Sequence, residues 1–173
     1  MAIINFEFKA KSLNSKVHEA QLMKLGAEFK GTDRQVDTYF NVPLGRLKLR
    51  EGNIENALIF YEREDIGGAK QSNILLYTHE PDKTLKDILC KVHGIKVIVN
   101  KTRNIYFIDN VKFHFDQVLD LGSFLEVEAI DSSGTIGISV LKDQCRKYST
   151  LFGIKEEDYV KESYSDLLLQ GSD

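Results

Sequence analysis

The chain has 173 residues, of which 42% are hydrophobic and 28% are charged, and its formal net charge at pH 7 is −3. These proportions are typical of a folded globular chain and exclude an extended disordered protein. The charge balance gives no overall basic excess of the kind that indicates nucleic-acid binding, and no apolar run approaches the roughly 18 residues of a membrane span.

The length fits one domain over residues 1–173, because a chain of this size can bury a sufficient core. Because the N-terminus enters a strand-like pattern directly, we expect no signal peptide. Cys90 and Cys145 are isolated, with neither metal-binding spacing nor a disulfide framework. Two scattered thiols are typical of a reducing compartment, and we therefore expect a cytoplasmic protein.

The first half of the chain begins with a strand pattern and a helix pattern. Residues 3–11 alternate apolar and polar side chains, and residues 14–27 have apolar positions at helical spacing that end near Gly26. Pro81 opens a further predicted helix at 81–93. Between these helices, alternation and turn residues predict four strands, at 34–42, 45–51, 56–65 and 70–80.

The second half contains a predicted three-stranded meander followed by helices. Segments 96–109 and 111–120 form a hairpin around Asp109-Asn110, and residues 122–131 form the third strand. Helical spacing then indicates helices at 134–152 and 157–169. This order of elements predicts an α+β fold with a mainly antiparallel sheet of about eight strands.

Several predicted strands carry like-charged residues on one face and apolar residues on the other. Arg46, Lys48 and Arg50 alternate with leucines, and the pattern recurs in Lys101 with Arg103 and in Glu126 with Glu128. His114 and Asp116 likewise share a polar face, opposite Phe113 and Phe115. A solvated sheet would mix the two signs, whereas a bound multivalent anion and a cation would neutralise segregated charges. We therefore expect a β-barrel with a charged interior, whose apolar outer face is covered by helices.

The residue types indicate what such an interior binds. Arg and Lys suit phosphate oxygens, which Arg can bind through two hydrogen bonds. Carboxylates suit Mg²⁺ or Mn²⁺, which commonly joins one or two carboxylates to the phosphates of a substrate. The pattern therefore predicts a cavity for a polyphosphate and a divalent cation.

A series of short segments also follows a familiar order: FEFKAK, DTYF, GRLKLR, FYERED, KTRNIYF, FHFDQVLDLGSFLEVE and ESYSDLL. Together they resemble the CYTH superfamily, the triphosphate tunnel metalloenzymes, and in particular its bacterial class IV adenylate cyclase-like branch, which is related to thiamine triphosphatases. The resemblance covers nearly the whole chain, although no segment is distinctive alone. It implies an eight-stranded antiparallel tunnel that binds a triphosphate with Mg²⁺ or Mn²⁺.

The resemblance also implies roles for individual residues. The metal carboxylates would be Glu7, Glu126 and Glu128, and the catalytic residues Lys9, Arg63 and Asp116, of which Asp116 matches an acid near the metal site. The bases that hold phosphates would be Lys9, Lys11, Arg46, Lys48, Arg50, Arg63, Lys70, Lys101 and Arg103.

One position departs from the family signature Glu-x-Glu-x-Lys, because its first glutamate is replaced by Asn5. An asparagine offers a carbonyl oxygen but no charge. One metal held by the three glutamates fits this pattern, and whether there is a second metal is left open.

The implied function is that of a metal-dependent enzyme acting on a triphosphate, as an adenylate cyclase-like enzyme that converts ATP to cyclic AMP and pyrophosphate. One alternative is a triphosphatase acting on tripolyphosphate or thiamine triphosphate, and another, which Asn5 favours, is a nucleotide- or polyphosphate-binding module without turnover. The expected partner is a triphosphate, with no nucleic acid and no membrane, and a homodimer is left open. Tyr39, Phe40 and Tyr61 are expected in the core rather than at a base-stacking mouth, and His114 as a structural residue or polar lining.

Overall fold

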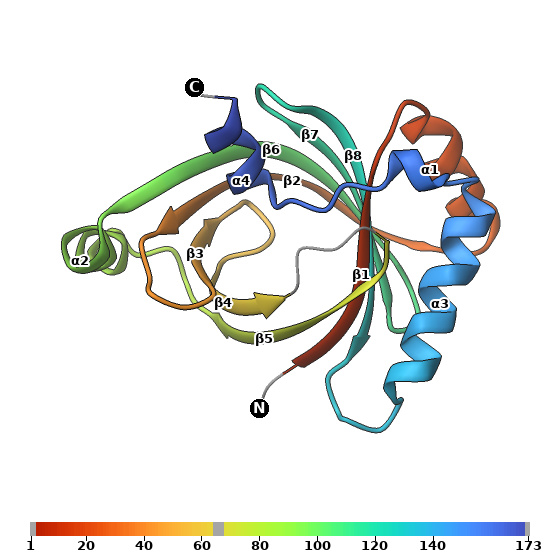
Figure 1. The fold of residues 1–173 in the computed structure, drawn as a ribbon, viewed down its shortest axis with the longest axis horizontal. Coiled ribbons are helices and arrows are strands. Elements are labelled where there is room, and N and C mark those ends of the chain that lie inside the picture. The colour runs from red at the N-terminus through yellow and green to blue at the C-terminus, as the bar shows by residue number, and fades with distance from the viewer. Residues whose placement is uncertain (1–2, 64–67, 172–173) are drawn as a thin grey trace.

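The computed structural model of the protein describes residues 3–63 and 68–171. Eight strands in this part close into an antiparallel barrel with the order β1-β5-β4-β3-β2-β6-β7-β8 (Figure 1). The predicted α+β fold with an eight-stranded antiparallel barrel is therefore confirmed. Within the same ranges, every helix is too short or too polar to cross a lipid bilayer.

The strands are β1 (Ile3–Lys11), β2 (Glu28–Phe40), β3 (Arg46–Glu51), β4 (Ala57–Arg63), β5 (Lys70–Thr78), β6 (Ile95–Ile108), β7 (Val111–Val118) and β8 (Gly122–Asp131). The helices are α1 (Ser15–Lys24), α2 (Lys83–His93), α3 (Ile138–Leu151) and α4 (Tyr164–Gln170), with a 3₁₀ turn at Glu156–Asp158. The end of the predicted strand 56–65 and part of the turn after it fall on residues 64–67, which lie outside the described residues.

β2 begins at Glu28, upstream of the strand that the sequence predicts at 34–42. The added residues pair with β6 as far as Glu28 opposite Phe107, and the register shifts between Phe29 and Gly31. This part of β2 is mostly polar, with little apolar alternation. Its strand conformation comes from pairing with β6, which the periodicity of one segment cannot reveal.

α3 begins at Ile138, later than the predicted start at residue 134. The reason is Asp131, the last residue of β8, whose carboxylate accepts hydrogen bonds from the backbone N–H groups of residues 134–137. This turn is therefore stabilised in a conformation that is not helical.

The predicted helix at 157–169 is shorter than expected, because α4 spans only Tyr164–Gln170. The preceding segment is extended along β1: Tyr159 forms a β-bridge with Ala10, and Val160 N donates a hydrogen bond to Lys9 O (2.9 Å). Ser163 then caps α4 by accepting from Asp166 N (3.2 Å).

The predicted hairpin around Asp109-Asn110 is confirmed, because β6 and β7 pair up to Ile108 opposite Val111. Asp109 adopts a positive φ of 50°, a conformation that aspartate and asparagine tolerate better than most residues. This hairpin sets the register of β7, which brings its polar face into the barrel.

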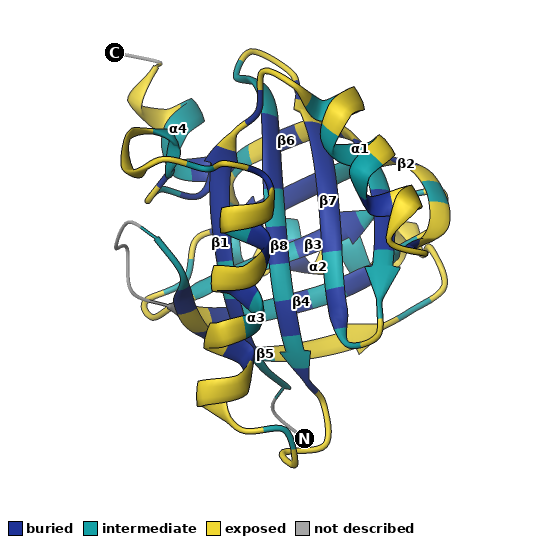
Figure 2. Ribbon diagram, turned by 90° about the vertical axis from the view of Figure 1, so that its right-hand side faces the viewer, coloured by how far each residue is buried: buried dark blue, intermediate teal, exposed yellow. Residues whose placement is uncertain are grey.

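The alternation of β1 separates the barrel interior from the hydrophobic core. Phe6, Phe8 and Ala10 belong to a core cluster with residues of α1 and α3, whereas Asn5, Glu7 and Lys9 line the interior cavity. Figure 2 shows α3 lying across β1 and β8, with α1 near β7. On the far side, Leu89 of α2 packs against Phe40 and Leu49. The predicted charged interior, with helices over an apolar outer face, is confirmed.

Candidate functional site

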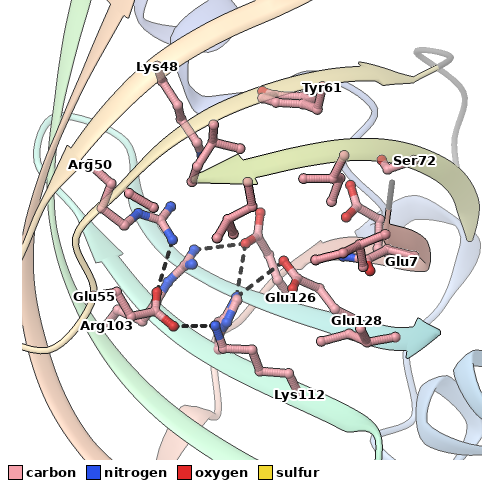
Figure 3. Close-up of a pocket in the computed structure, with 18 of the residues that line it drawn as sticks. Glu7, Lys48, Arg50, Glu55, Tyr61, Ser72, Arg103, Lys112, Glu126 and Glu128 are labelled. Atoms are coloured by element: carbon pink, nitrogen blue, oxygen red, sulfur yellow. Dashed lines mark hydrogen bonds and ion pairs between the residues drawn. The ribbon is translucent and has the colours of Figure 1, made fainter. Parts of the chain in front are cut away.

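The barrel encloses a cavity with a volume of about 350 Å³ (Figure 3). Inward-facing side chains from all eight strands contribute to its wall, together with the loop before β4 and the beginning of α4. The charged residues that line it are Glu7, Lys9, Lys48, Arg50, Glu55, Lys101, Arg103, Lys112, Glu126 and Glu128.

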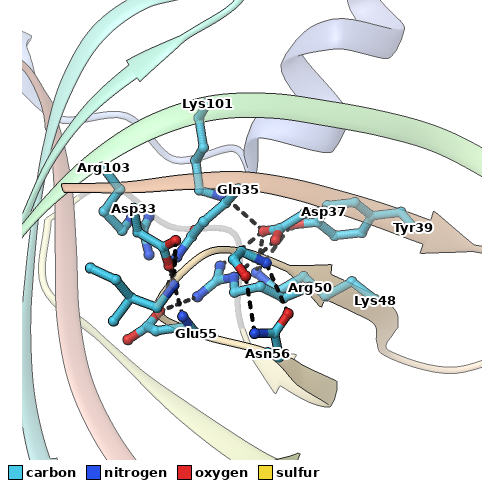
Figure 4. A network of polar contacts seen from close by, with 12 residues as sticks. Asp33, Gln35, Asp37, Tyr39, Lys48, Arg50, Glu55, Asn56, Lys101 and Arg103 are labelled. Carbon is cyan, nitrogen blue, oxygen red and sulfur yellow. Dashed lines mark hydrogen bonds and ion pairs between the residues drawn. The ribbon is translucent and has the colours of Figure 1, made fainter. Parts of the chain in front are cut away.

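One part of the wall is a basic network around Asp37 (Figure 4). Arg50 donates two hydrogen bonds to this carboxylate, Nε to Oδ1 and Nη2 to Oδ2, both 2.9 Å long. The Lys101 ammonium lies 2.6 Å and the Lys48 ammonium 3.2 Å from Asp37 Oδ2. Burial would raise the pKa of Asp37, but these three cations hold it well below its usual value. Asp37 thus contacts three basic groups and gathers them in one part of the wall.

Lys101 is a base of this network whose pKa is lowered from its usual value. Its side chain is buried, and burial lowers the pKa of its ammonium to about 7, against the attraction of Asp37. The nearby cations Arg50, Arg103 and Lys48 lower it further. Near neutral pH, Lys101 therefore exists as a mixture of charged and neutral forms, and a bound polyanion would favour the charged form.

A second network joins Arg103 to two carboxylates. Arg103 donates to both oxygens of Asp116, at 2.6 Å from Nε and 2.5 Å from Nη2, and its Nη2 also reaches Glu126 Oε2 at 2.8 Å. The Tyr164 hydroxyl donates to Asp116 Oδ2 at 2.7 Å. Asp116 is therefore fully engaged behind Arg103, where it fixes the guanidinium between the basic and acidic parts of the wall.

The acidic part of the wall is formed by β1, β7 and β8. His114, Glu126 and Glu128 have ligand atoms that all lie within 4.8 Å of one another. Glu7 stands directly opposite Glu128 in the register of β1 and β8. Glu126 is also approached by the Lys9 ammonium at 3.3 Å and by His114 Nδ1 at 3.3 Å.

The protonation of this cluster differs from residue to residue. Burial, with the negative charges of Glu7 and Glu126, raises the pKa of Glu128 to about 7 despite Lys112. Burial acts on Glu126 in the same sense, but Lys9 and Arg103 hold the pKa of its carboxyl well below the usual value. Burial and the cations Arg103 and Lys112 lower the pKa of His114 to about 3, so its imidazole is neutral.

The chemistry of this cluster fits a divalent cation. Carboxylate oxygens are the ligands that Mg²⁺ and Mn²⁺ prefer, and a cation would relieve the repulsion that raises the pKa of Glu128. The imidazole of His114 is neutral and therefore does not repel a bound cation. Its Nε2 is a buried nitrogen without a hydrogen-bond partner among the described residues. The donor set therefore suits a hard metal ion better than it suits an isolated buried acid pair.

The structure brings most of the candidate residues from the sequence into one cavity. The candidates that line it are Glu7, Lys9, Lys48, Arg50, Lys101, Arg103, Glu126 and Glu128. Asp116 lies immediately behind Arg103. Tyr39 and Tyr61 are buried, as expected, and they also line the cavity, whereas Phe40 lies in the core beside α2.

Three other candidate bases are not brought into the cavity. Lys11 is exposed at the end of β1. Arg46 pairs with Asp166 of α4 at 2.8 Å and lines a separate, smaller hollow. Lys70 is buried, but its ammonium donates to Lys161 O (2.6 Å) in the segment before α4. The side chain of Arg63 lies outside the described part of the structure.

The expectation that a ligand is needed to neutralise like-charged strands is wrong, because neighbouring strands of the barrel already supply opposite charges. Arg50 stands opposite Asp37 across β2 and β3, and Arg103 stands opposite Asp116 across β6 and β7. The like charges of one strand are thus paired with opposite charges on its neighbour. Cross-strand pairing is invisible in the alternation of a single strand.

Three charged residues of the site were missed by the sequence reasoning. Asp37 shares a strand face with Tyr39, and Lys112 shares one with His114, so alternation alone could have found both. Glu55 lies in the loop between β3 and β4, where no periodicity applies. Its carboxylate reaches Arg50 at 3.0 Å and also pairs with Lys112.

The loop that carries Glu55 is fixed by Asp33. The Asp33 carboxylate accepts the backbone N–H groups of Ile54 and Glu55, both at 2.9 Å. Gly52 allows this approach, because a Cβ atom at that position would lie 2.6 Å from Asp33 Oδ1. Glu55 is therefore held in place by backbone contacts that depend on a glycine.

Comparisons with known proteins agree with this architecture. A family model described as the CYTH domain matches residues 4–164. A protein from Pyrococcus horikoshii is 25% identical, with a TM-score of 0.76 over 94% of this chain and 98% of that chain. A candidate adenylate cyclase from Vibrio parahaemolyticus is 15% identical, with a TM-score of 0.78 over 95% and 97% of the two chains.

A third similar structure is a candidate adenylyl cyclase from Hippeastrum with a dominant triphosphatase activity. It is 13% identical, with a TM-score of 0.61 over 98% of this chain and 95% of that chain. A search of curated proteins found no match.

Proposed function

This chain belongs to the CYTH domain family, and from that membership and the charges of its cavity we propose that it binds a triphosphate together with a divalent cation and cleaves the triphosphate. The observation that carries the proposal is the division of one cavity wall into a basic part and an acidic part. Lys48, Arg50 and Lys101 surround Asp37 in the first part, and Glu126 and Glu128 lie in the second.

The basic residues would bind and extend the phosphate chain. Arg50 is oriented by its two hydrogen bonds to Asp37, and Arg103 by its two to Asp116. Guanidinium groups held in this way need little further ordering when an anion arrives, so positioning and electrostatic stabilisation supply most of the catalysis. Lys9, 3.3 Å from Glu126, would carry positive charge to the acidic end.

Glu126, Glu128 and Glu7 would hold the metal, with His114 orienting Glu126. A bound Mg²⁺ or Mn²⁺ would offset negative charge on the phosphate oxygens. Asn5 lies two residues before Glu7 on the same strand face and brings no charge. The chain's own carboxylates therefore support one cation site more strongly than two.

Of the reactions open to this cavity, we favour an adenylate cyclase-like one. The ribose 3′-oxygen would bond to the α-phosphorus, the bond to the β-phosphate would break, and pyrophosphate and the hydroxyl proton would leave. This reaction needs no activated water, which agrees with the neutral Asn5. The alternative is hydrolysis of tripolyphosphate or an organic triphosphate, which the triphosphatase activity of the Hippeastrum neighbour favours.

The test offers the purified protein ATP, tripolyphosphate and thiamine triphosphate, each with Mg²⁺ or Mn²⁺. We expect cyclic AMP and pyrophosphate from ATP. Orthophosphate would instead identify a triphosphatase, and tight binding with neither product would identify a sensor. If no triphosphate binds or reacts, the proposal is wrong.

A further inference from the structure

The helices cover the apolar outer surface of the barrel unevenly. Figure 1 shows α1 and α3 on one side of the barrel and α2 on the other. α1 and α3 contribute to the core cluster over β1, β7 and β8, whereas α2 covers β2 and β3 through Leu85 and Leu89. Next to α2, the outer face of β5 carries Leu75 and Tyr77, which are 54% and 66% exposed. Large apolar side chains therefore remain in contact with water on this side of the barrel.

The register of the strands joins these side chains into one surface. Leu75 is opposite Phe60, and Tyr77 is opposite Leu58, across β4 and β5. The turn before β3 lies against the same surface, because a Cβ atom on Gly45 would be 2.7 Å from Phe60 Cζ. Leu44, the residue before this glycine, is 64% exposed. β4, β5 and this turn thus form a continuous apolar surface outside the barrel.

One flank of α2 extends this surface. Leu85 and Leu89 pack in the cluster that also contains Leu58, the residue opposite Tyr77. Ile88 and Val92 follow them by three positions, so they lie beside them on the helix, and they are 52% and 68% exposed. We call the exposed residues together the outer apolar face: Leu44, Leu75, Tyr77, Ile88 and Val92.

The extent of the outer apolar face fits a partner of protein size. Each of its five side chains is more than half exposed. Contiguous apolar patches on monomeric proteins seldom exceed a few hundred Å², and larger ones mark interaction sites. An apolar centre that contains a tyrosine and has a charged border is the usual anatomy of a homodimer interface.

The charged residues at the border of this face carry both signs. Asp87 and Lys91 are exposed on α2, next to Ile88 and Val92. Glu62 is exposed on β4, two residues after Phe60. An anionic lipid surface would meet the acids of this border. A two-fold axis presents the border to itself, so that each acid can lie near a base of the other copy. The charges therefore fit a second copy of this chain.

We propose that the protein forms a two-fold symmetric homodimer through the outer apolar face. The partner covers the β4–β5 surface and the exposed flank of α2 in each copy. Leu76 and Thr78 alternate with Leu75 and Tyr77 along β5 and line the cavity. The partner thus supports one wall of the cavity from outside, whichever reaction the cavity carries out.

Sedimentation velocity over a range of protein concentrations measures the assembly. We expect a species with the mass of two 19.7-kDa chains. Tyr77→Lys on β5 and Val92→Lys on α2 should each weaken the dimer by about tenfold or more, because an apolar contact is replaced by a charge in the interface. Leu13→Lys is the matched control, since Leu13 is 96% exposed just before α1 on the opposite side of the barrel, and it should leave the dimer unchanged.

Hydrogen exchange of the wild type provides a test that needs no variant. Amides of β5 and α2 should exchange more slowly in concentrated than in dilute protein, whereas those of α1 and α3 should not change. The inference is overturned if the wild type stays monomeric, if both the Tyr77 and the Val92 variants still dimerise as the wild type does, or if the protection lies elsewhere. A monomer that binds vesicles of phosphatidylcholine and phosphatidylserine would also overturn it and would assign the outer apolar face to lipid.

Discussion

Asp37 and Arg50 face each other across β2 and β3, and two hydrogen bonds of 2.9 Å join the carboxylate to the guanidinium. Both side chains are buried, and the second guanidinium edge reaches Glu55 at 3.0 Å. The plane of Arg50 is therefore fixed by acids on two sides before any ligand binds.

Replacing Arg50 by alanine should weaken triphosphate binding by roughly thirtyfold, or about 2 kcal/mol, the usual range for a hydrogen bond to a charged group. The melting temperature should also fall, because Asp37 loses its bidentate partner. Calorimetry and thermal unfolding measure the two effects. Arg34→Ala, which removes an exposed arginine from β2, should change neither. An unchanged dissociation constant in Arg50→Ala would show that this guanidinium is not a phosphate ligand.

Glu126→Gln should abolish metal-dependent turnover, because the amide keeps the shape of the side chain but loses the charge that attracts the cation. Turnover with Mn²⁺ and direct Mn²⁺ binding by electron paramagnetic resonance are the measurements. Glu62→Gln on the exposed face of β4 is the control. Full activity of the Glu126 variant would remove this residue from the metal site.

Because the pKa of Lys101 is lowered, we expect triphosphate binding to be accompanied by proton uptake. With a pKa of about 7 in the free protein, this ammonium is mostly neutral at pH 8 and mostly charged at pH 6. A bound polyanion raises its pKa, so binding should take up close to one proton at pH 8 and far less at pH 6. The groups that face it are Asp37, Lys48, Arg50 and Arg103, with the ring of Tyr164 at 6.0 Å.

The uptake is measured by titrating at pH 8 in two buffers of different ionisation enthalpy. Lys101→Met should reduce the proton uptake by close to one proton, because Glu128 can still titrate, whereas Lys91→Met, on the exposed face of α2, should leave the uptake unchanged. Equal proton uptake in wild type and Lys101→Met would place the titrating group elsewhere.

Gly52→Ala should destabilise the protein by about 1–3 kcal/mol, the usual cost of overpacking. The new Cβ atom would lie 2.6 Å from Asp33 Oδ1 and 2.8 Å from Glu55 O, so the loop that carries Glu55 must shift. Urea unfolding measures the loss. Gly171→Ala, whose Cβ would meet its nearest atom at 3.7 Å, should unfold like the wild type.

The alternation of β1 and β8 was sufficient to predict which of their residues face the cavity. Glu7, Lys9, Glu126 and Glu128 all line it, because the apolar face of these strands packs against α1 and α3 and only the other face is left for the interior. Alternation does not define where the cavity ends along a strand. Lys11 continues the inward series of β1, yet it lies beyond the cavity and is exposed.

Other features depend on elements that are distant in the sequence. Lys70 shares its strand face with Ser72, but the segment before α4 engages its ammonium through Lys161 O. Glu55 enters the site because Asp33 fixes its loop. Contacts of this kind follow from the closure of the barrel and from loop geometry, and neither leaves a periodic signal in the chain.

β1 is the first strand of the fold, yet its two neighbours in the barrel are β5 and β8. During translation it leaves the ribosome long before either partner, and the Lys9 ammonium meets its acceptor, Glu162 O, only 153 residues downstream. Pairing across such separations slows folding. The nascent chain therefore emerges with an incomplete barrel, and the charged interior can be assembled only once the chain has been synthesised beyond Glu162.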